Sequence, residues 1–351
     1  MSAEKRLIGR NVSFNRQRAR KGELTAAAVI CLSLMIGLCG RAEAADTLRL
    51  GVQKTGTFAW ELAVIKAEKL DAKANLDLVV TELASTEAGK IALLGGSVDL
   101  IISDWLWVAR ERGLETNLVF YPYSTALGAL MVPGDSAAQK LDDLRGKTLG
   151  VAGGPIDKSW LLLRALAQRG GLDLKARARV VFGAPALLYE KAVAGELDAN
   201  LTFWNYAVAL ESRGFRRLIG MDEVERSLGA KGPLAMTGYV FDESLAKTHG
   251  DALARFFQVA HQARERLASS DADWQRIGKE LGVTDPKELA LYRQRYVDGF
   301  PKRSVADEEA DAATLYAIVR EIGGPELVGA ATTLNPGVFY KGAGERTPAD
   351  R

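Results

Sequence analysis

Gly96-Ser97-Val98-Asp99-Leu100-Ile101-Ile102-Ser103-Asp104-Trp105 has a pattern that returns later in the chain. Gly195-Glu196-Leu197-Asp198 is likewise followed by five residues and then a tryptophan, Trp204. In both copies an alanine- and leucine-rich helical run ends at glycine, which takes a left-handed C-cap without steric penalty, and a β-prone run follows. The copies are 99 residues apart (195 − 96), which predicts two similar α/β lobes.

The tryptophan that ends each copy is a candidate binding residue. Open α/β sheets bind ligands at the carboxyl ends of parallel strands, so we expect Trp105 and Trp204 to lie at facing strand ends. A structural role is the alternative. Gly-x-x-Asp between a helix and a strand is common turn chemistry, and a tryptophan near a strand end is often part of the core.

The order of predicted elements divides the 351 residues into a split lobe and an inserted lobe. We expect lobe 1 to comprise residues 45–130 and 236–351, and lobe 2 to comprise residues 131–235. Each lobe is predicted to be a mixed sheet flanked by helices. Two crossing segments would then form a hinge around a central cleft, with the turn cluster Pro133-Gly134-Asp135-Ser136 as one part of it.

Residues 1–44 have the pattern of a cleaved secretion signal. A basic segment precedes the apolar run Leu24–Leu38, and Ala42-Glu43-Ala44 supplies a small-x-small cleavage pattern. The apolar run is too short for a membrane anchor, and neither a lipoprotein nor a twin-arginine pattern is present. Cys31 and Cys39 both fall in this segment, so we expect a secreted chain without disulfides or thiolate metal sites.

Charge and histidine content argue against several functional classes. The signal carries eight Lys or Arg and three Glu, so the whole-chain charge of +2 becomes −3 without it. A chain with this charge has no basic stripe for nucleic acid or membrane binding. His249 and His261 are twelve residues apart on one predicted helix, too far to share a metal ion. We therefore expect no catalytic residues, no metal and no cofactor.

Three motifs together resemble a known family. They are Leu50-Gly51-Val52-Gln53-Lys54-x-Gly56, the repeated Gly-x-x-Asp, and Asp142-x-Leu144-Arg145-Gly146-Lys147 leading to Gly150-Val151. In order and spacing, over about residues 47–300, they resemble periplasmic substrate-binding proteins of ABC importers. The nearest group is the nitrate, sulfonate and taurine type, which also includes binders of thiamine precursors.

The resemblance implies a Venus-flytrap fold that captures a small solute between two lobes and delivers it to a permease and ATPase pair. It also implies a periplasmic, monomeric protein. Carried over by position, the family's binding regions correspond to Lys54, Thr55, Gly56, Thr57, Trp60, Asp104, Trp105, Gly153, Gly154, Ser159, Trp160, Phe203, Trp204 and Asn205.

Two kinds of solute fit these residues. For an anionic head group, the helix starts after Gly56 and Gly154 would supply backbone N–H donors. For a cationic or ring-bearing solute, the four tryptophans would form aromatic walls, with Asp104 as the counter-charge. The structural alternatives are a helix N-cap for Asp104 and a solvated side chain for Lys54. We favour a solute with an apolar or aromatic portion.

Two other functions remain open on sequence. A sensory or docking protein would share the same lobes and differ only in its receptor. A pyrimidine-forming enzyme of the same fold would need a histidine and metal ligands, which the sequence supplies poorly.

Overall fold

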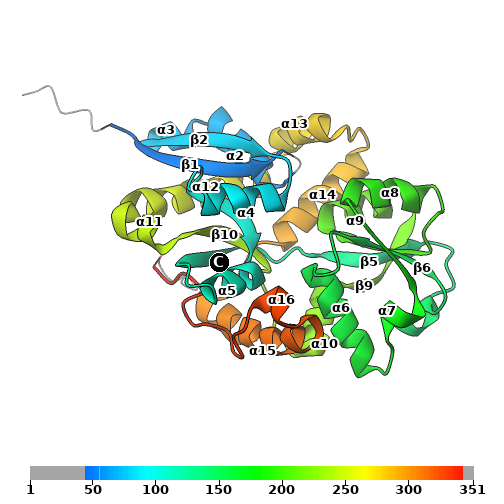
Figure 1. Cartoon of the computed structure of the whole chain (residues 1–351). Helices are drawn as coiled ribbons and strands as arrows, with labels where there is room; N and C mark the ends of the chain where they lie inside the picture. The colour runs from blue at the N-terminus through cyan, green and yellow to red at the C-terminus, as the bar shows by residue number, and fades with distance from the viewer. Residues whose placement is uncertain (1–43, 55, 343–351) are drawn as a thin grey trace, which may run out of the picture. The chain divides into compact units, whose positions relative to one another are not determined.

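The structure of the protein is a computed structural model, which describes residues 44–54 and 56–342. Every strand and helix within these residues belongs to one compact unit that begins at Asp46. Within the described residues, ten strands form two five-stranded mixed sheets (Figure 1). The first sheet has the order β2-β1-β3-β10-β4, with bounds β1 Asp46–Gln53, β2 Leu76–Leu83, β3 Leu100–Asp104, β4 Leu118–Ser124 and β10 Thr237–Asp242.

The second sheet repeats the first, with the order β7-β6-β8-β5-β9. Its strands are β5 Gly128–Pro133, β6 Thr148–Ala152, β7 Arg179–Gly183, β8 Ala199–Phe203 and β9 Phe215–Gly220. In each sheet three strands are parallel, and the fourth strand in the order is antiparallel to both of its neighbours. The prediction of two similar mixed sheets is confirmed.

The chain leaves the first sheet after Ser124 and returns to it at Thr237. The next strand, β5, belongs to the second sheet and runs from Gly128 to Pro133. It begins inside the segment expected for lobe 1. The expectation of a hinge at Pro133-Gly134-Asp135-Ser136 is wrong, because this turn follows β5 and links two strands of the second sheet. The first crossing segment instead lies between Ser124 and Gly128.

The repeated Gly-x-x-Asp ties each sheet together at the start of a strand. The Asp99 carboxylate accepts the backbone N–H of Arg49 at 2.8 Å, and the Asp99 N–H donates to the Arg49 carbonyl at 2.7 Å. Asp198 makes the same pair of contacts with Thr148, at 2.8 Å and 3.0 Å. The structural role of this motif, an alternative on sequence, is therefore present in both copies.

Close approach explains one glycine in each sheet. A Cβ on Gly51 would lie 2.9 Å from Ile101, and a Cβ on Gly150 would lie 2.6 Å from Leu197. Only glycine lets β1 and β6, the second strand in the order of each sheet, run this close to the side chains beside them.

Helices follow the strands in each half, and most begin where the sequence offers a cap or a proline. The helices of the first half are α2 Phe58–Ala67, α3 Leu70–Lys73, α4 Thr86–Leu94 and α5 Trp105–Arg112. A short 3-10 turn, Leu141–Leu144, precedes β6. The second half has α6 Lys158–Arg169, α7 Leu174–Arg177, α8 Pro185–Val193, α9 Trp204–Ser212 and α10 Met221–Leu228, drawn in green in Figure 1.

The C-terminal helices contact both halves. They are α11 Glu243–Thr248, α12 Gly250–Ser269, α13 Asp271–Leu281, α14 Pro286–Asp298, α15 Val305–Gly323 and α16 Pro325–Val328. α12 packs on α2, α14 on α9, α15 on α6 and α10, and α16 on α5. The two largest hydrophobic clusters accordingly each contain residues from both halves. A last segment adds to the edge of the first sheet, where Phe339 forms a parallel bridge to Phe120.

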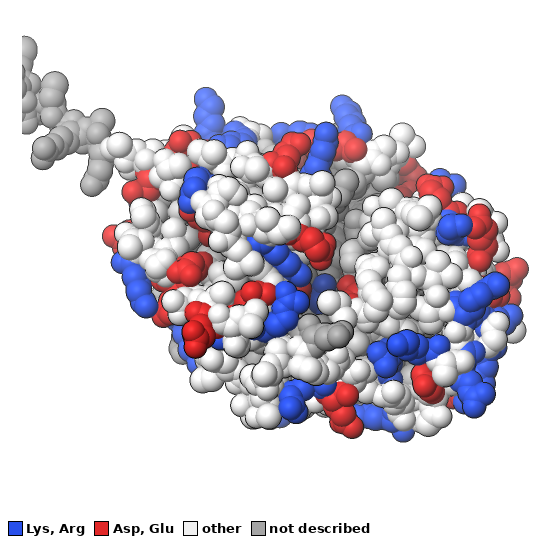
Figure 2. All heavy atoms as spheres, in the orientation of Figure 1, with Lys and Arg blue, Asp and Glu red and all other residues white. Residues whose placement is uncertain are grey.

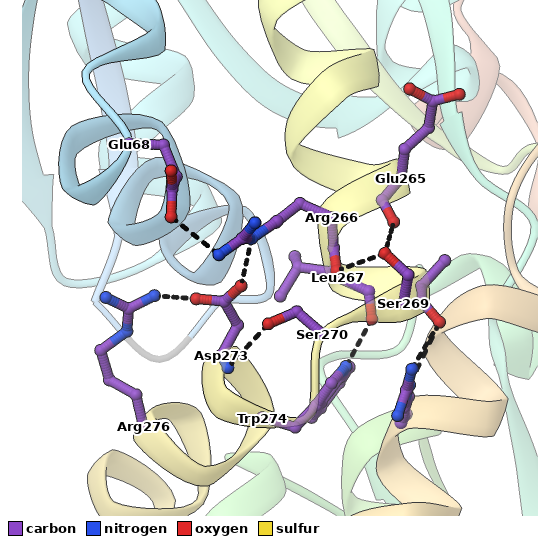
Figure 3. A network of polar contacts seen from close by, with 11 residues as sticks. Glu68, Glu265, Arg266, Leu267, Ser269, Ser270, Asp273, Trp274 and Arg276 are labelled. Atoms are coloured by element: carbon purple, nitrogen blue, oxygen red, sulfur yellow. Dashed lines mark hydrogen bonds and ion pairs between the residues drawn. The ribbon is translucent and has the colours of Figure 1, made fainter.

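A buried carboxylate holds the corner between α12 and α13. Asp273 is 3% exposed, and its carboxylate accepts a hydrogen bond from Arg266 and forms an ion pair with Arg276 (Figure 3). Its backbone N–H donates to the Ser270 hydroxyl at 3.2 Å. Arg266 also reaches Glu68, in the residue after α2, at 2.9 Å. The corner is thus fixed to the first half of the chain.

Among the described helices, none has the length and apolar character needed to span a bilayer.

Candidate functional site

The loop between β1 and α2 brings Thr57 to the start of a helix. Gly56 donates its N–H to the Gln53 carbonyl at 2.9 Å, which closes the turn, and Thr57 is the N-cap of α2. The Thr57 hydroxyl lies 3.2 Å from the Tyr123 hydroxyl. Lys54 is exposed. Thr55, another candidate, lies outside the described residues.

A second helix start, in the other half of the chain, is the step from β8 to α9. Phe203 is the N-cap of α9 and Trp204 its first residue, with Asn205 half-buried beside it. Within the described residues, neither Thr57 nor Phe203 makes a side-chain cap hydrogen bond. The first turns of α2 and α9 therefore keep the partial positive charge that backbone N–H groups give to a helix start.

These two helix starts are close together. The rings of Trp60, in the first turn of α2, and Trp204 meet edge to face with centroids 5.8 Å apart. Both rings also contact Tyr292 and Tyr296 of α14, and Trp60 contacts Trp274 of α13. The structure thus brings together two of the predicted tryptophans, one from each half of the chain. Both rings are buried in one hydrophobic cluster, with Trp60 4% and Trp204 9% exposed. Figure 2 shows a hollow in the surface between the two halves.

Trp105 does not take the place expected for it opposite Trp204. It is fully buried, its indole N–H donates to the sulfur of Met236 at 3.2 Å, and its ring packs against Phe339. Trp160 is also buried, and packs against Phe182. In this structure both indoles lie in the hydrophobic core and expose almost no surface.

Carboxylates cap α5, which follows β3, and α6, which follows β6. Asp104 accepts the N–H of Trp107 at 2.9 Å at the start of α5. Asp157, which sequence reasoning did not select, accepts the N–H groups of Ser159 and Trp160 at 2.9 and 3.4 Å at the start of α6. An Asp directly before a helical run is an N-cap signal that could have found it. These contacts satisfy the donors that an anion would otherwise use at α5 and α6.

Asp104 and Asp157 also influence each other. Burial raises the pKa of Asp157, the nearby cation of Lys158 opposes this rise, and the negative charge of Asp104 adds to it. The two carboxylates, one from each half of the chain, are thus within electrostatic range of each other.

Two lysines balance this negative charge. Lys90 of α4 has its ammonium 4.0 Å from the Asp104 carboxylate and 5.3 Å from the centre of the Trp107 ring. Lys158 lies 5.7 Å from the centre of the Phe203 ring, so it connects the start of α6 to the end of β8. Lys90 was not among the predicted residues.

The remaining predicted residues surround the start of α6. Gly153 has φ of +89°, which favours glycine, and Gly154 follows it. Ser159 is 2% exposed, and its hydroxyl has no hydrogen-bond partner among the described residues. No group of three His, Cys, Asp or Glu side chains in the described chain is arranged to hold a metal ion.

A family model described as NMT1/THI5 like matches residues 72–270, more than half of the chain. The chain belongs to the NMT1/THI5-like family. The matched segment of this NMT1/THI5-like protein includes both Gly-x-x-Asp copies and the starts of α5, α6 and α9. No curated protein sequence matches the chain significantly.

Solved structures share the fold of this NMT1/THI5-like chain. The alkanesulfonate-binding protein SsuA from Xanthomonas axonopodis pv. citri, bound to MOPS, has a TM-score of 0.64 at 20% identity, covering 85% of this chain and 99% of that chain. The periplasmic aliphatic sulphonate binding protein SsuA from Escherichia coli has a TM-score of 0.65 at 18% identity, covering 84% and 92%. The Candida albicans CA3427 gene product, described as having the generic periplasmic binding protein fold, gives 0.56 at 12%, covering 79% and 90%. The chain therefore has a periplasmic-binding-protein fold.

Proposed function

We propose that this protein is the solute-binding component of an ABC importer and captures a small sulfonate- or taurine-like organic anion between its two halves. The observation that carries the proposal is the contact between Trp60 and Trp204, which places the starts of α2 and α9 side by side. Two uncapped helix starts attract an anion, and of the two indoles Trp204, the more exposed at 9%, would meet the apolar part of the solute.

The neighbouring charges support an amino group on the same solute. Asp104 and Asp157 sit at the starts of α5 and α6, where their carboxylates would attract an ammonium group and repel a second anion. A zwitterionic aminosulfonate satisfies both regions. A nitrogenous ring compound is the alternative solute, and it would use the indoles and the carboxylates without the helix starts.

A binding role is favoured over catalysis by the position of the histidines. His249 precedes α12, and His261 has a side chain 58% exposed on that helix. Neither is among the residues at the starts of α2, α5, α6 and α9. A general base would have to lie within hydrogen-bond reach of the solute.

The partners and location belong to the same proposal. We expect a monomer, secreted through the signal at residues 1–44, to work in the periplasm and to dock on a membrane permease and its ATPase. Residues 1–43 lie outside the described residues, so N-terminal sequencing of the exported protein is the appropriate test. A mature chain that begins at Ala45 supports cleavage after Ala44, and one that begins at Asp46 supports cleavage after Ala45.

The deciding experiment combines native mass spectrometry with calorimetry on the chain from residue 45. The calorimetric panel is ethanesulfonate, taurine, MOPS and an aminopyrimidine. We expect one solute per protein and tightest binding for taurine, with a stability gain of about 2.7 kcal/mol at a hundredfold excess over the Kd. Binding of the aminopyrimidine alone would select the ring compound. A protein that binds none of the four and carries no small molecule would contradict a sulfonate-importing role and leave the sensory alternative.

A further inference from the structure

A buried charge network lies directly behind the start of α2. Its centre is Glu61, one turn after Thr57 and with no exposed surface. The Glu61 carboxylate accepts the Tyr296 hydroxyl at 2.6 Å and the Tyr239 hydroxyl at 3.2 Å, and Arg264 Nε donates to it at 3.1 Å. A buried carboxylate is costly unless hydrogen bonds and an opposite charge compensate it, and both are present around Glu61.

Arg264 extends the network to Tyr123. Its guanidinium donates to the Tyr239 hydroxyl at 2.9 Å and lies 4.6 Å from the centre of the Tyr123 ring. Tyr123 is 4% exposed, and its ring is also fixed edge-on by Phe58 and Tyr239. Its hydroxyl is therefore held at one place, 3.2 Å from the Thr57 hydroxyl.

The three tyrosine hydroxyls of the network keep their protons and can act as hydrogen-bond donors. Burial raises the pKa of Tyr123, Tyr239 and Tyr296 well above the usual value, and the negative charge of Glu61 raises it further. Their hydroxyls stay protonated at neutral pH. The network therefore keeps the same hydrogen bonds at neutral pH.

The network contacts three residues of the candidate site. Tyr123 contacts Thr57 at the start of α2, and Tyr296 contacts both Trp60 and Trp204. Tyr123 also directly precedes Ser124, where the chain leaves the first sheet.

We propose that Tyr123, held by the Glu61–Arg264 pair, is a positioning residue that orients Thr57 for solute binding without touching the solute. This inference rests on the proposed function for the identity of the solute. It adds that affinity depends on a hydroxyl in the core, one hydrogen bond away from the site.

The test is a double-mutant cycle of Thr57→Val and Tyr123→Phe, with ethanesulfonate as the probe in calorimetry. Tyr123→Phe keeps the ring under Arg264 and removes only the hydroxyl. We expect Thr57→Val to weaken binding about tenfold and Tyr123→Phe to weaken it about fivefold. The double variant should bind no more weakly than Thr57→Val alone, because the two substitutions remove the same interaction. A double variant weakened about fiftyfold, or Tyr123→Phe with wild-type affinity, would overturn the positioning role.

A matched control and a ligand-independent measurement complete the design. Tyr316→Phe removes an equally buried hydroxyl that bonds only the carbonyls of Val328 and Ala331, among the described residues. It should change melting temperature as Tyr123→Phe does and leave affinity unchanged. In the solute-free protein, amide exchange at residues 56–60 should rise at least fivefold in Tyr123→Phe and stay constant in Tyr316→Phe. If wild type does not bind ethanesulfonate, the proposed function fails for that solute, and unchanged exchange in Tyr123→Phe would separately overturn the positioning role.

Discussion

The indole rings of Trp60 and Trp204 meet edge to face 5.8 Å apart, although one lies on α2 beside the first sheet and the other begins α9 beside the second. An aromatic pair of this geometry contributes about 0.5–1.5 kcal/mol beyond the area it buries. This contact joins the two halves within one hydrophobic cluster, beside the starts of α2 and α9. Changes to either ring should therefore affect both binding and the association of the halves.

Trp204→Ala should weaken binding of ethanesulfonate at least tenfold, because it removes the aromatic wall contributed by the second half. Calorimetry on the folded variant measures this. Trp105→Phe is the control, since Trp105 is fully buried among other residues and should lower the melting temperature with less than a twofold effect on affinity. Wild-type affinity in a correctly folded Trp204→Ala protein would assign Trp204 to the core.

Asp104→Asn should separate charge from capping. Asparagine caps helices about as well as aspartate, so the unfolding free energy should change by only a few tenths of a kcal/mol. Removing the negative charge beside the site should strengthen binding of ethanesulfonate by about two- to fivefold and weaken binding of taurine, whose ammonium group loses a partner. Equal changes for both sulfonates in parallel titrations would show that Asp104 does not sense the solute's charge.

Asp99→Ala and Asp198→Ala should lower the free energy of unfolding, because each removes the acceptor for a backbone N–H at the start of a strand. We expect a loss of about 1–3 kcal/mol for Asp99 and a smaller one for Asp198, whose side chain is 43% exposed against 18%. Urea denaturation measures both. A larger loss at Asp198 would show that the two copies differ in role despite their shared geometry.

Asp273 should make stability fall in acid. Burial tends to raise its pKa, but hydrogen bonds from Ser270 and Arg266 and the charge of Arg276 hold the pKa below the ordinary 3.8 (Figure 3). A folded pKa below the unfolded one stabilises the protein above the unfolded value, and that stabilisation is lost as pH falls through the folded pKa. Asp273→Asn should therefore flatten the dependence of unfolding free energy on pH between about pH 5 and 2. An unchanged slope in denaturation curves would show that other carboxylates carry the acid response.

Local chemistry explains which parts of the fold could be predicted. The repeat around Asp99 and Asp198 marked equivalent helix-turn-strand units, because caps and turns depend on residues close together in sequence. The starts of α2 and α6 were predicted from the glycines that precede them, Gly56 and Gly154. These signals do not show which strands pair with one another. The first segment of lobe 1 was therefore expected to end at residue 130, a few residues after the chain leaves the first sheet at Ser124.

The cluster around Trp60 could not be read from local pattern. Its partners Trp204, Trp274, Tyr292 and Tyr296 come from three distant helices, and each looks like an ordinary core aromatic in its own helix. Glu61 gave a usable signal, since it is a single acid within the otherwise apolar stretch Phe58–Ile65. A charge at such a position is buried only with a partner, but the sequence alone does not show that the partner is Arg264.

The placement of β10 sets the order in which the sheets can be completed as the chain emerges from its N-terminus. Every strand of the second sheet has been synthesised once Gly220 emerges, whereas the first sheet lacks an inner strand until Asp242 follows. Domains generally fold as units during synthesis, with the N-terminal one first. In this chain the half that begins earlier is completed later, so β3 and β4 lack their shared partner β10 while the inserted half folds.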